Sequence, residues 1–90
     1  MNWTVVWQRR AQNDLAALWN AATDRQAVAD AANRIDALLH RDPEGVGAPR
    51  SATHRVLRVA PLVVQYEVSR DDCLVSVFDV RRSSSVYGGP

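Results

Sequence analysis

The residues of this chain that are best suited to chemistry are arginines in its last third. Arg55 and Arg58 lie in one β-prone run, Arg81 and Arg82 close the last such run, and Tyr87 follows five residues later. A guanidinium stays charged at any relevant pH, and its planar fork matches the oxygens of a phosphate. Two fixed cations and a phenol at one edge of a sheet therefore suit the binding or cleavage of a phosphate backbone.

The same arginines also have a purely structural interpretation, as solvated side chains paired with Glu67 or Asp79. All eleven basic residues are arginine and 13 residues are alanine, a bias that a GC-rich genome produces without any functional cause. The net charge is only +1. The chain is therefore not basic as a whole, and any phosphate site must be local.

Other reaction centres have little support in the sequence. His40, His54 and Cys73 lack the spacing of metal ligands, so neither a metal nor another cofactor is expected. Cys73 begins a β-prone run and is interpreted as a small buried hydrophobe rather than a reactive thiolate. Gly45-Val46-Gly47 lacks the helix and the lysine that follow a phosphate-binding loop.

Length and composition limit the class of protein. The 90 residues are expected to form one domain, residues 1–90, with a thin core, since a chain of this size buries only about 60% of its unfolded surface. A single cysteine excludes an intrachain disulfide and fits a reducing cytoplasm. No signal peptide is found, and no apolar run approaches the roughly 18 residues of a membrane span, so no membrane partner is expected.

The first half of the chain predicts one strand and two helices. Alternating apolar and polar residues over 2–8 indicate a strand with one buried face. Apolar residues at helical spacing predict helices over residues 10–21 and 24–41. Thr23-Asp24-Arg25-Gln26 has the pattern of a capping box that begins the second helix. Because only a few residues join the helices, they are expected to form an antiparallel hairpin.

The second half predicts three strands after a loop rich in glycine and proline over residues 42–53. The strands are expected near residues 54–60, 62–69 and 73–81, with short reversals that make them an antiparallel meander. The fold class is therefore α+β, with the order βααβββ and an antiparallel sheet that carries the helix hairpin on one face.

The meander determines the faces on which the arginines lie. Arg55 and Arg58 have opposite parity along their strand, so at most one faces the helices, and the same holds for Arg81 and Arg82. The first and third strands of the meander run the same way, so Arg58 is expected near Arg81 or Arg82.

The three tryptophans are interpreted as core residues rather than as a stacking surface for bases. The expected core comprises Trp3 or Trp7, Leu15, Leu18, Ile35, Leu38, Val64 and Tyr66.

The order and spacing of residues along almost the whole chain match a known pattern. They are, in chain order, Trp3, Val5 and Trp7, Asp14-Leu15, Ala27 to Pro43 with Ile35-Asp36-Ala37-Leu38-Leu39, Gly45 or Gly47, Arg55-Val56-Leu57, Pro61 to Val64, Tyr66-Glu67-Val68, and Val75 to Val80 before arginine. Together they resemble the RelE/ParE family of bacterial type II toxins. The resemblance implies the βααβββ fold and a cognate antitoxin that lays a helix or an extended segment over the toxin.

The resemblance implies one of two targets. RelE-like members are metal-independent endoribonucleases that cut messenger RNA on the ribosome, and ParE-like members inhibit DNA gyrase. The RelE-like pattern implies catalytic roles for Arg58, Arg81, Arg82 and Tyr87, and RNA-binding roles for Arg50, Arg55 and Arg58. The chain departs from that pattern at Ala60-Pro61-Leu62-Val63, where the ribonucleases place another arginine, and it lacks their lysines. A gyrase inhibitor and a non-toxic partner-binding module therefore stay open as alternatives.

Overall fold

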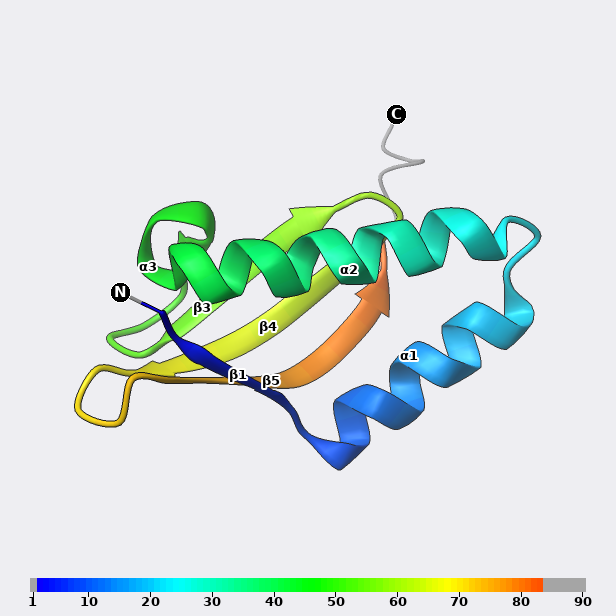
Figure 1. Cartoon of the computed structure of the whole chain (residues 1–90). Helices are drawn as coiled ribbons and strands as arrows, with labels where there is room; N and C mark the ends of the chain where they lie inside the picture. The colour runs from blue at the N-terminus through cyan, green and yellow to red at the C-terminus, as the bar shows by residue number, and fades with distance from the viewer. Residues whose placement is uncertain (1, 84–90) are drawn as a thin grey trace.

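The computed structural model describes residues 2–83 as a five-stranded sheet with two long helices packed against it (Figure 1). The elements in chain order are β1 Thr4–Trp7, α1 Arg9–Ala21, α2 Arg25–Arg41, α3 Pro43–Val46, β2 Ala48–Pro49, β3 His54–Val59, β4 Leu62–Ser69 and β5 Leu74–Arg82. The predicted α+β class is confirmed, and the loop predicted over residues 42–53 contains the short elements α3 and β2. No helix within residues 2–83 is long and apolar enough to cross a membrane.

The strand order in the sheet is β1-β5-β4-β3-β2. β3, β4 and β5 form the predicted antiparallel meander, and β2 adds a short antiparallel edge. β1 differs from the expectation of a wholly antiparallel sheet, because it pairs in parallel with β5, from Thr4 opposite Leu74 to Trp7 opposite Val77. A parallel neighbour needs a long crossover in the chain, and the helices and the meander between β1 and β5 supply it.

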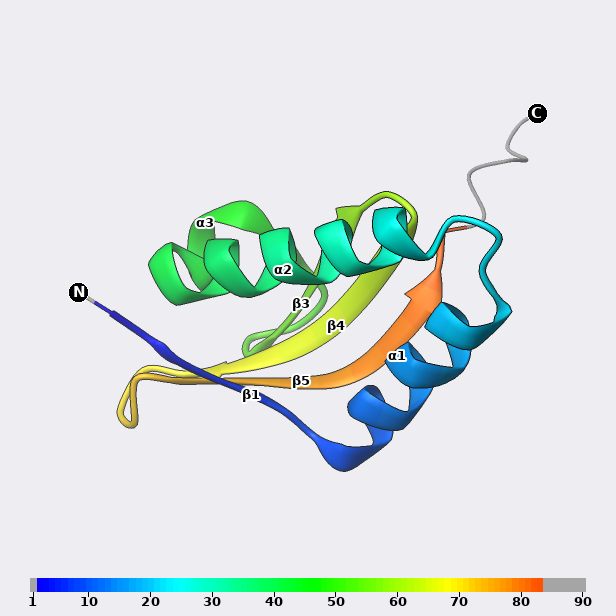
Figure 2. The ribbon, with the colours of Figure 1, turned by 45° about the vertical axis from the view of Figure 1, so that its right-hand side comes forward.

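The two helices lie differently against the sheet. Figures 1 and 2 show α2 crossing one face of the sheet, while α1 lies beside β5 beyond the end of β1. The change from strand to helix is abrupt, because the backbone N–H of Gln8 donates to Val77 and α1 begins at the next residue. Asp24, rather than Thr23, is the N-cap of α2, and its side chain accepts a hydrogen bond from the N–H of Ala27 at 3.0 Å.

The core lies between α2 and the sheet. Of the expected core residues, Ile35, Val64 and Tyr66 are fully buried, and the tryptophans of the N-terminal strand and the expected leucines are partly buried against them. The core position predicted for Trp19 is wrong, since its side chain is 42% exposed. Trp19 lies at the edge of the apolar stripe of α1, and the guanidinium of Arg25 covers its ring at 4.7 Å.

Cys73 also differs from its predicted place. It precedes β5 in the turn that follows β4, is only partly buried, and has a φ of 49°. This left-handed backbone conformation is uncommon for a residue with a Cβ and is typical of tight turns.

Candidate functional site

Arg58 and Arg81 share one face of the sheet. Arg58 is paired with Val63, and Val63 is paired in turn with Arg81. Directly opposite residues of neighbouring strands project to the same side, and the next row, which contains Val64, is buried under the helices. Arg58 and Arg81 therefore project from the side away from α2, here called the open face. The expectation that the ends of the first and third meander strands meet at one edge is confirmed.

A buried carboxylate orients Arg81. The Nε atom of Arg81 donates to Oδ2 of Asp79 at 3.1 Å, and Nε2 of Gln65 donates to the same oxygen at 3.2 Å. The side chain of Asp79 is 8% exposed, whereas that of Arg81 is 70% exposed. One edge of the Arg81 guanidinium is thus held by the protein, and the rest of it faces solvent.

A bulge in β5 brings Asp79 and Arg81 to the open face. Gln65 pairs with Asp79 but Tyr66 pairs with Val77, so Phe78 is an additional residue in β5. The bulge reverses the inward and outward alternation of every later residue in the strand. The sequence carries a signal of this bulge, because the buried valines follow two-residue spacing up to Val77 and the next buried valine is Val80. Sequence reasoning missed the bulge, but it had named Asp79 as a possible partner of the arginines, and the Arg81–Asp79 ion pair confirms that interpretation.

Arg82 and Arg50 lie apart from the Arg58–Arg81 row. Arg82 is exposed on the helix side of the sheet, where it lines a groove of about 320 Å³ with Leu18, Pro61 and neighbouring residues. Arg50 is exposed near the beginning of β3, where its N–H donates to the carbonyl of His54. The structure therefore places Arg58 and Arg81 in one row of the open face, while Arg81 and Arg82 both line a second groove beside Arg10 and Asp14 of α1. Tyr87 lies outside the described residues.

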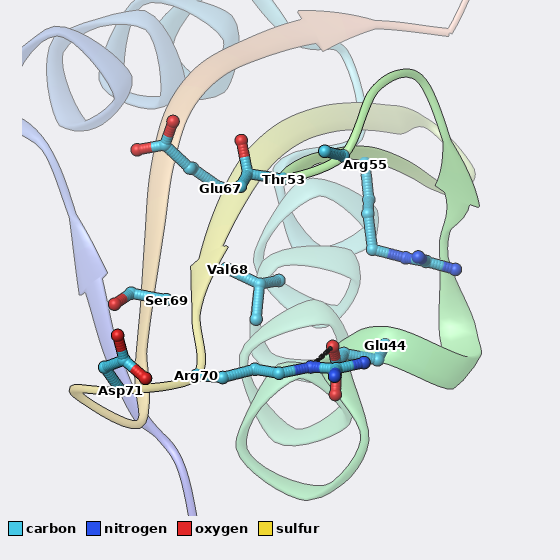
Figure 3. Close-up of a pocket in the computed structure, with 9 residues that line it drawn as sticks. Glu44, Thr53, Arg55, Glu67, Val68, Ser69, Arg70 and Asp71 are labelled. Carbon is cyan, nitrogen blue, oxygen red and sulfur yellow. Dashed lines mark hydrogen bonds and ion pairs between the residues drawn. The ribbon is translucent and has the colours of Figure 1, made fainter.

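Arg55 faces the helix side and holds the loop that precedes β3. Its Nη2 atom donates to the carbonyl of Gly47 at 2.7 Å, and its Nε atom is buried and makes no hydrogen bond within residues 2–83. Figure 3 shows Arg55 on the wall of a pocket of about 650 Å³ near the start of β3. Arg70 crosses this pocket to pair with Glu44, with 2.6 Å between Nε and Oε2. The pocket thus holds charges of both signs and is separate from the Arg58–Arg81 row.

Tyr66 anchors the same loop from inside the core. Its hydroxyl donates to the carbonyl of Pro43 at 2.5 Å, and its side chain is fully buried. Burial raises the pKa of the Tyr66 phenol above its ordinary value of 10.0, the Arg55 guanidinium lowers this pKa in part, and Asp42 raises it. The neutral phenol is therefore the form that the folded protein stabilises.

Replacing Tyr66 with phenylalanine is expected to flatten the dependence of stability on alkaline pH. The pKa of Tyr66 is raised in the folded state, so its stabilisation is full below about pH 10 and is lost as the pH rises through the folded pKa. Tyr66→Phe also leaves the Pro43 carbonyl without its donor, at a cost of about 1–3 kcal/mol at neutral pH. Urea unfolding at about pH 8 and about pH 11 measures both effects. If the unaltered protein and Tyr66→Phe lose the same stability between the two pH values, Tyr66 is not the source of the alkaline pH dependence.

Among residues 2–83, no group of three or more His, Cys, Asp or Glu side chains is placed to hold a metal ion. The described part of the site consists of Arg58 and Arg81, the Asp79 carboxylate that orients Arg81, and the sheet surface between them. Such an arrangement can bind an anion and stabilise charge that develops on it.

Comparisons relate this architecture to known proteins. A family model described as the ParE toxin of type II toxin–antitoxin systems matches residues 5–87. A chain of the toxin–antitoxin complex RelBE2 from Mycobacterium tuberculosis superposes with a TM-score of 0.77 at 21% identity, covering 91% of this chain and 99% of that one.

Two further solved structures share the fold. A chain of the chromosomal ParDE system from P. aeruginosa gives a TM-score of 0.70 at 19% identity and covers 89% of this chain and 95% of that one. The isolated E. coli RelE toxin gives 0.67 at 14% identity and covers 96% of this chain and 92% of that one. No curated protein sequence matches the chain. At these identities the structural likenesses establish the fold alone.

Proposed function

The chain belongs to the RelE/ParE family and is the toxin of a type II toxin–antitoxin system, and from this premise we propose that it inhibits translation by cleaving messenger RNA on the ribosome. The observation that carries the proposal is the row formed by Arg58, Val63 and Arg81 on the open face. In the proposed function this row would present two guanidinium groups to one phosphate, and the buried carboxylate of Asp79 holds that of Arg81 in place.

The proposed reaction uses the RNA itself as nucleophile. The 2′-hydroxyl attacks the adjacent phosphorus and forms the 2′-O–P bond while the P–O5′ bond breaks, which gives a 2′,3′-cyclic phosphate and a 5′-hydroxyl. Negative charge grows on the phosphoryl oxygens, and guanidinium groups already oriented there lower the barrier. Tyr87 is the candidate that takes or gives the proton. A phenol with the ordinary pKa of about 10 is poorly matched to the role of base unless cations close to it lower that pKa.

Inhibition of DNA gyrase is the second candidate function. The match to the ParE toxin model favours it. A second observation agrees, because Asp79 offsets the charge of Arg81 and leaves a mixed polar and apolar surface of the kind that also binds proteins. In this function the open face is a docking surface and Tyr87 has no chemical role.

The proposed partner is a cognate antitoxin protein. Structures of the same fold are described as toxin–antitoxin complexes. We propose that an acidic antitoxin segment crosses the open face near Arg58 and Arg81, where it would cover the site. A non-toxic binding module would dock a partner in the same way, but its expression alone would not slow bacterial growth.

Tyr87→Phe separates the two toxin functions, because it keeps the ring and removes only the hydroxyl. If the chain cleaves messenger RNA, the variant is expected to lose growth arrest and to leave messenger RNA on translating ribosomes intact, as measured by primer extension. The control is an assay of gyrase supercoiling with the unaltered protein. Arrest that survives in Tyr87→Phe, together with blocked supercoiling and intact messenger RNA, would reject the ribonuclease in favour of the gyrase inhibitor.

A further inference from the structure

An aromatic pair lies on the open face, beside the arginine row. The ring centroids of His54 and Phe78 are 5.1 Å apart, and their planes are tilted by 48°. β4 separates the strands that carry them, so the rings meet above β4. Both side chains are partly exposed, and Phe78 is not among the hydrophobic side chains that pack against the core.

The placement of His54 confirms that this pair projects away from the helices. His54 is opposite Glu67, and Nε2 of His54 lies 3.1 Å from Oε2 of Glu67. Glu67 follows the fully buried Tyr66 and therefore projects to the other side of β4. Because Phe78 contacts His54, its ring is on the open face as well. A phenylalanine ring outside the core and partly open to solvent has a surface available for a ligand.

We propose that Phe78, supported by His54, is a stacking platform for a base of single-stranded RNA whose phosphate is bound by Arg58 and Arg81. The inference rests on the ribonuclease function proposed above and extends it to the recognition of a base. Unpaired bases are commonly bound by stacking on aromatic side chains beside a cationic path for the backbone. Of the candidate partners, RNA alone combines flat bases with the phosphates that arginine forks match.

The spacing of the platform and the arginine row suits a short unpaired strand. Arg58 is four residues beyond His54 along β3, and Arg81 is three residues beyond Phe78 along β5. At about 3.3 Å per residue, the aromatic pair and the arginine row are roughly 10–13 Å apart along the strands. The side chains of arginine are long enough to shorten that distance at the phosphate.

The two carboxylates that the strands carry on this face do not oppose such a ligand strongly, and a third, Asp14 of α1, lines a groove beside Arg81. Asp79 is buried and accepts hydrogen bonds from Gln65 and Arg81, so its charge is already compensated. Glu67 pairs with His54 on the side of the platform away from the arginine row. The cations Arg58 and Arg81 thus lie at the end of the face where the phosphate is placed.

The test measures binding of a labelled oligonucleotide of about eight nucleotides. It carries 2′-O-methyl groups, which remove the nucleophile, and a matched copy has abasic sites in place of its bases. Fluorescence anisotropy is expected to show that Phe78→Ala weakens binding of the base-containing strand about tenfold and leaves binding of the abasic strand unchanged. Phe78→Tyr should keep the affinity of the unaltered protein. The matched control is Val6→Ala, which shortens an exposed aliphatic side chain on the same face and should leave the affinity for both strands unchanged.

Two results would overturn the platform while leaving the ribonuclease in place. One is that Phe78→Ala weakens binding of both strands equally while the unaltered protein cleaves messenger RNA on ribosomes. The other is that Phe78→Ala weakens the complex with the antitoxin and not the complex with RNA. Failure of the unaltered protein to bind either strand and to cleave messenger RNA would overturn the proposed function and the platform together.

Discussion

Replacing Arg58 and Arg81 together with alanine is expected to abolish growth arrest when the toxin is expressed without its antitoxin. The two side chains flank one position on the open face, and each would donate to the phosphoryl oxygens as charge develops on them. Loss of one such donor typically lowers a rate by about 10²–10³. Without both side chains, the described residues would therefore supply little rate acceleration. Growth of cells that express the double variant should match that of uninduced cells.

Arg34 and Arg41 provide a matched control for this double variant. Both are exposed on α2, so replacing both with alanine changes the net charge equally without touching the open face. Arrest should persist in the control, and circular dichroism should show both double variants folded. Arg82→Ala, on the helix side of the sheet, should reduce arrest less than Arg81→Ala. Full arrest by the Arg58 and Arg81 double variant would contradict the phosphate site.

Replacing Gly47 with alanine is expected to cause a large loss of stability for the addition of one methyl group. A Cβ atom at Gly47 would lie 2.2 Å from the hydroxyl oxygen of Tyr66 and 3.0 Å from the carbonyl oxygen of Val56. Tyr66 is buried and cannot move away, so the loop must shift and lose the hydrogen bonds to Tyr66 and Arg55. Overpacking typically costs about 1–3 kcal/mol, and each broken hydrogen bond adds to this cost.

Thermal unfolding measures this effect directly. A domain of this size loses roughly 4–8 °C of melting temperature for each kcal/mol, so Gly47→Ala should melt at least about 10 °C below the unaltered protein. The control is the double variant Gly47→Ala with Tyr66→Phe, which removes the clashing hydroxyl. If the clash is the cause, Tyr66→Phe should lower the stability less in the Gly47→Ala variant than in the unaltered protein. Additive losses would show that the close approach is not responsible.

Local pattern predicted most of the fold and part of the site. The helix limits agree with the apolar spacing to about one residue, because each helix buries one continuous stripe. The pairing of β1 with β5 could not be predicted from the sequence, since it depends on contacts between the two ends of the chain. Trp19 was wrongly predicted to be a core residue, because helical periodicity alone does not separate the buried apolar stripe of a helix from the exposed edge of that stripe.

For the site, the shared direction of the first and third meander strands was sufficient to predict that Arg58 would lie near Arg81 or Arg82. It could not decide between the last two, since that choice depends on the bulge at Phe78. The role of Asp79 follows from the same bulge and from its burial. The spacing of Val75, Val77 and Val80 carries a signal of the bulge, whereas nothing in the sequence shows that Asp79 is buried. The predicted role of Tyr87 stays a prediction, because this residue lies outside the described part of the chain.

The bulge in β5 also determines how this chain should be compared with its relatives. One inserted residue puts the two halves of β5 out of phase, so Arg81 reaches the open face while Arg82 reaches the opposite side. A relative without the bulge, with the same two arginines at the end of the strand, would present the other one. Basic residues at this strand end therefore correspond between family members only when they are counted from the bulge. An alignment that ignores it would equate side chains on opposite faces of the sheet.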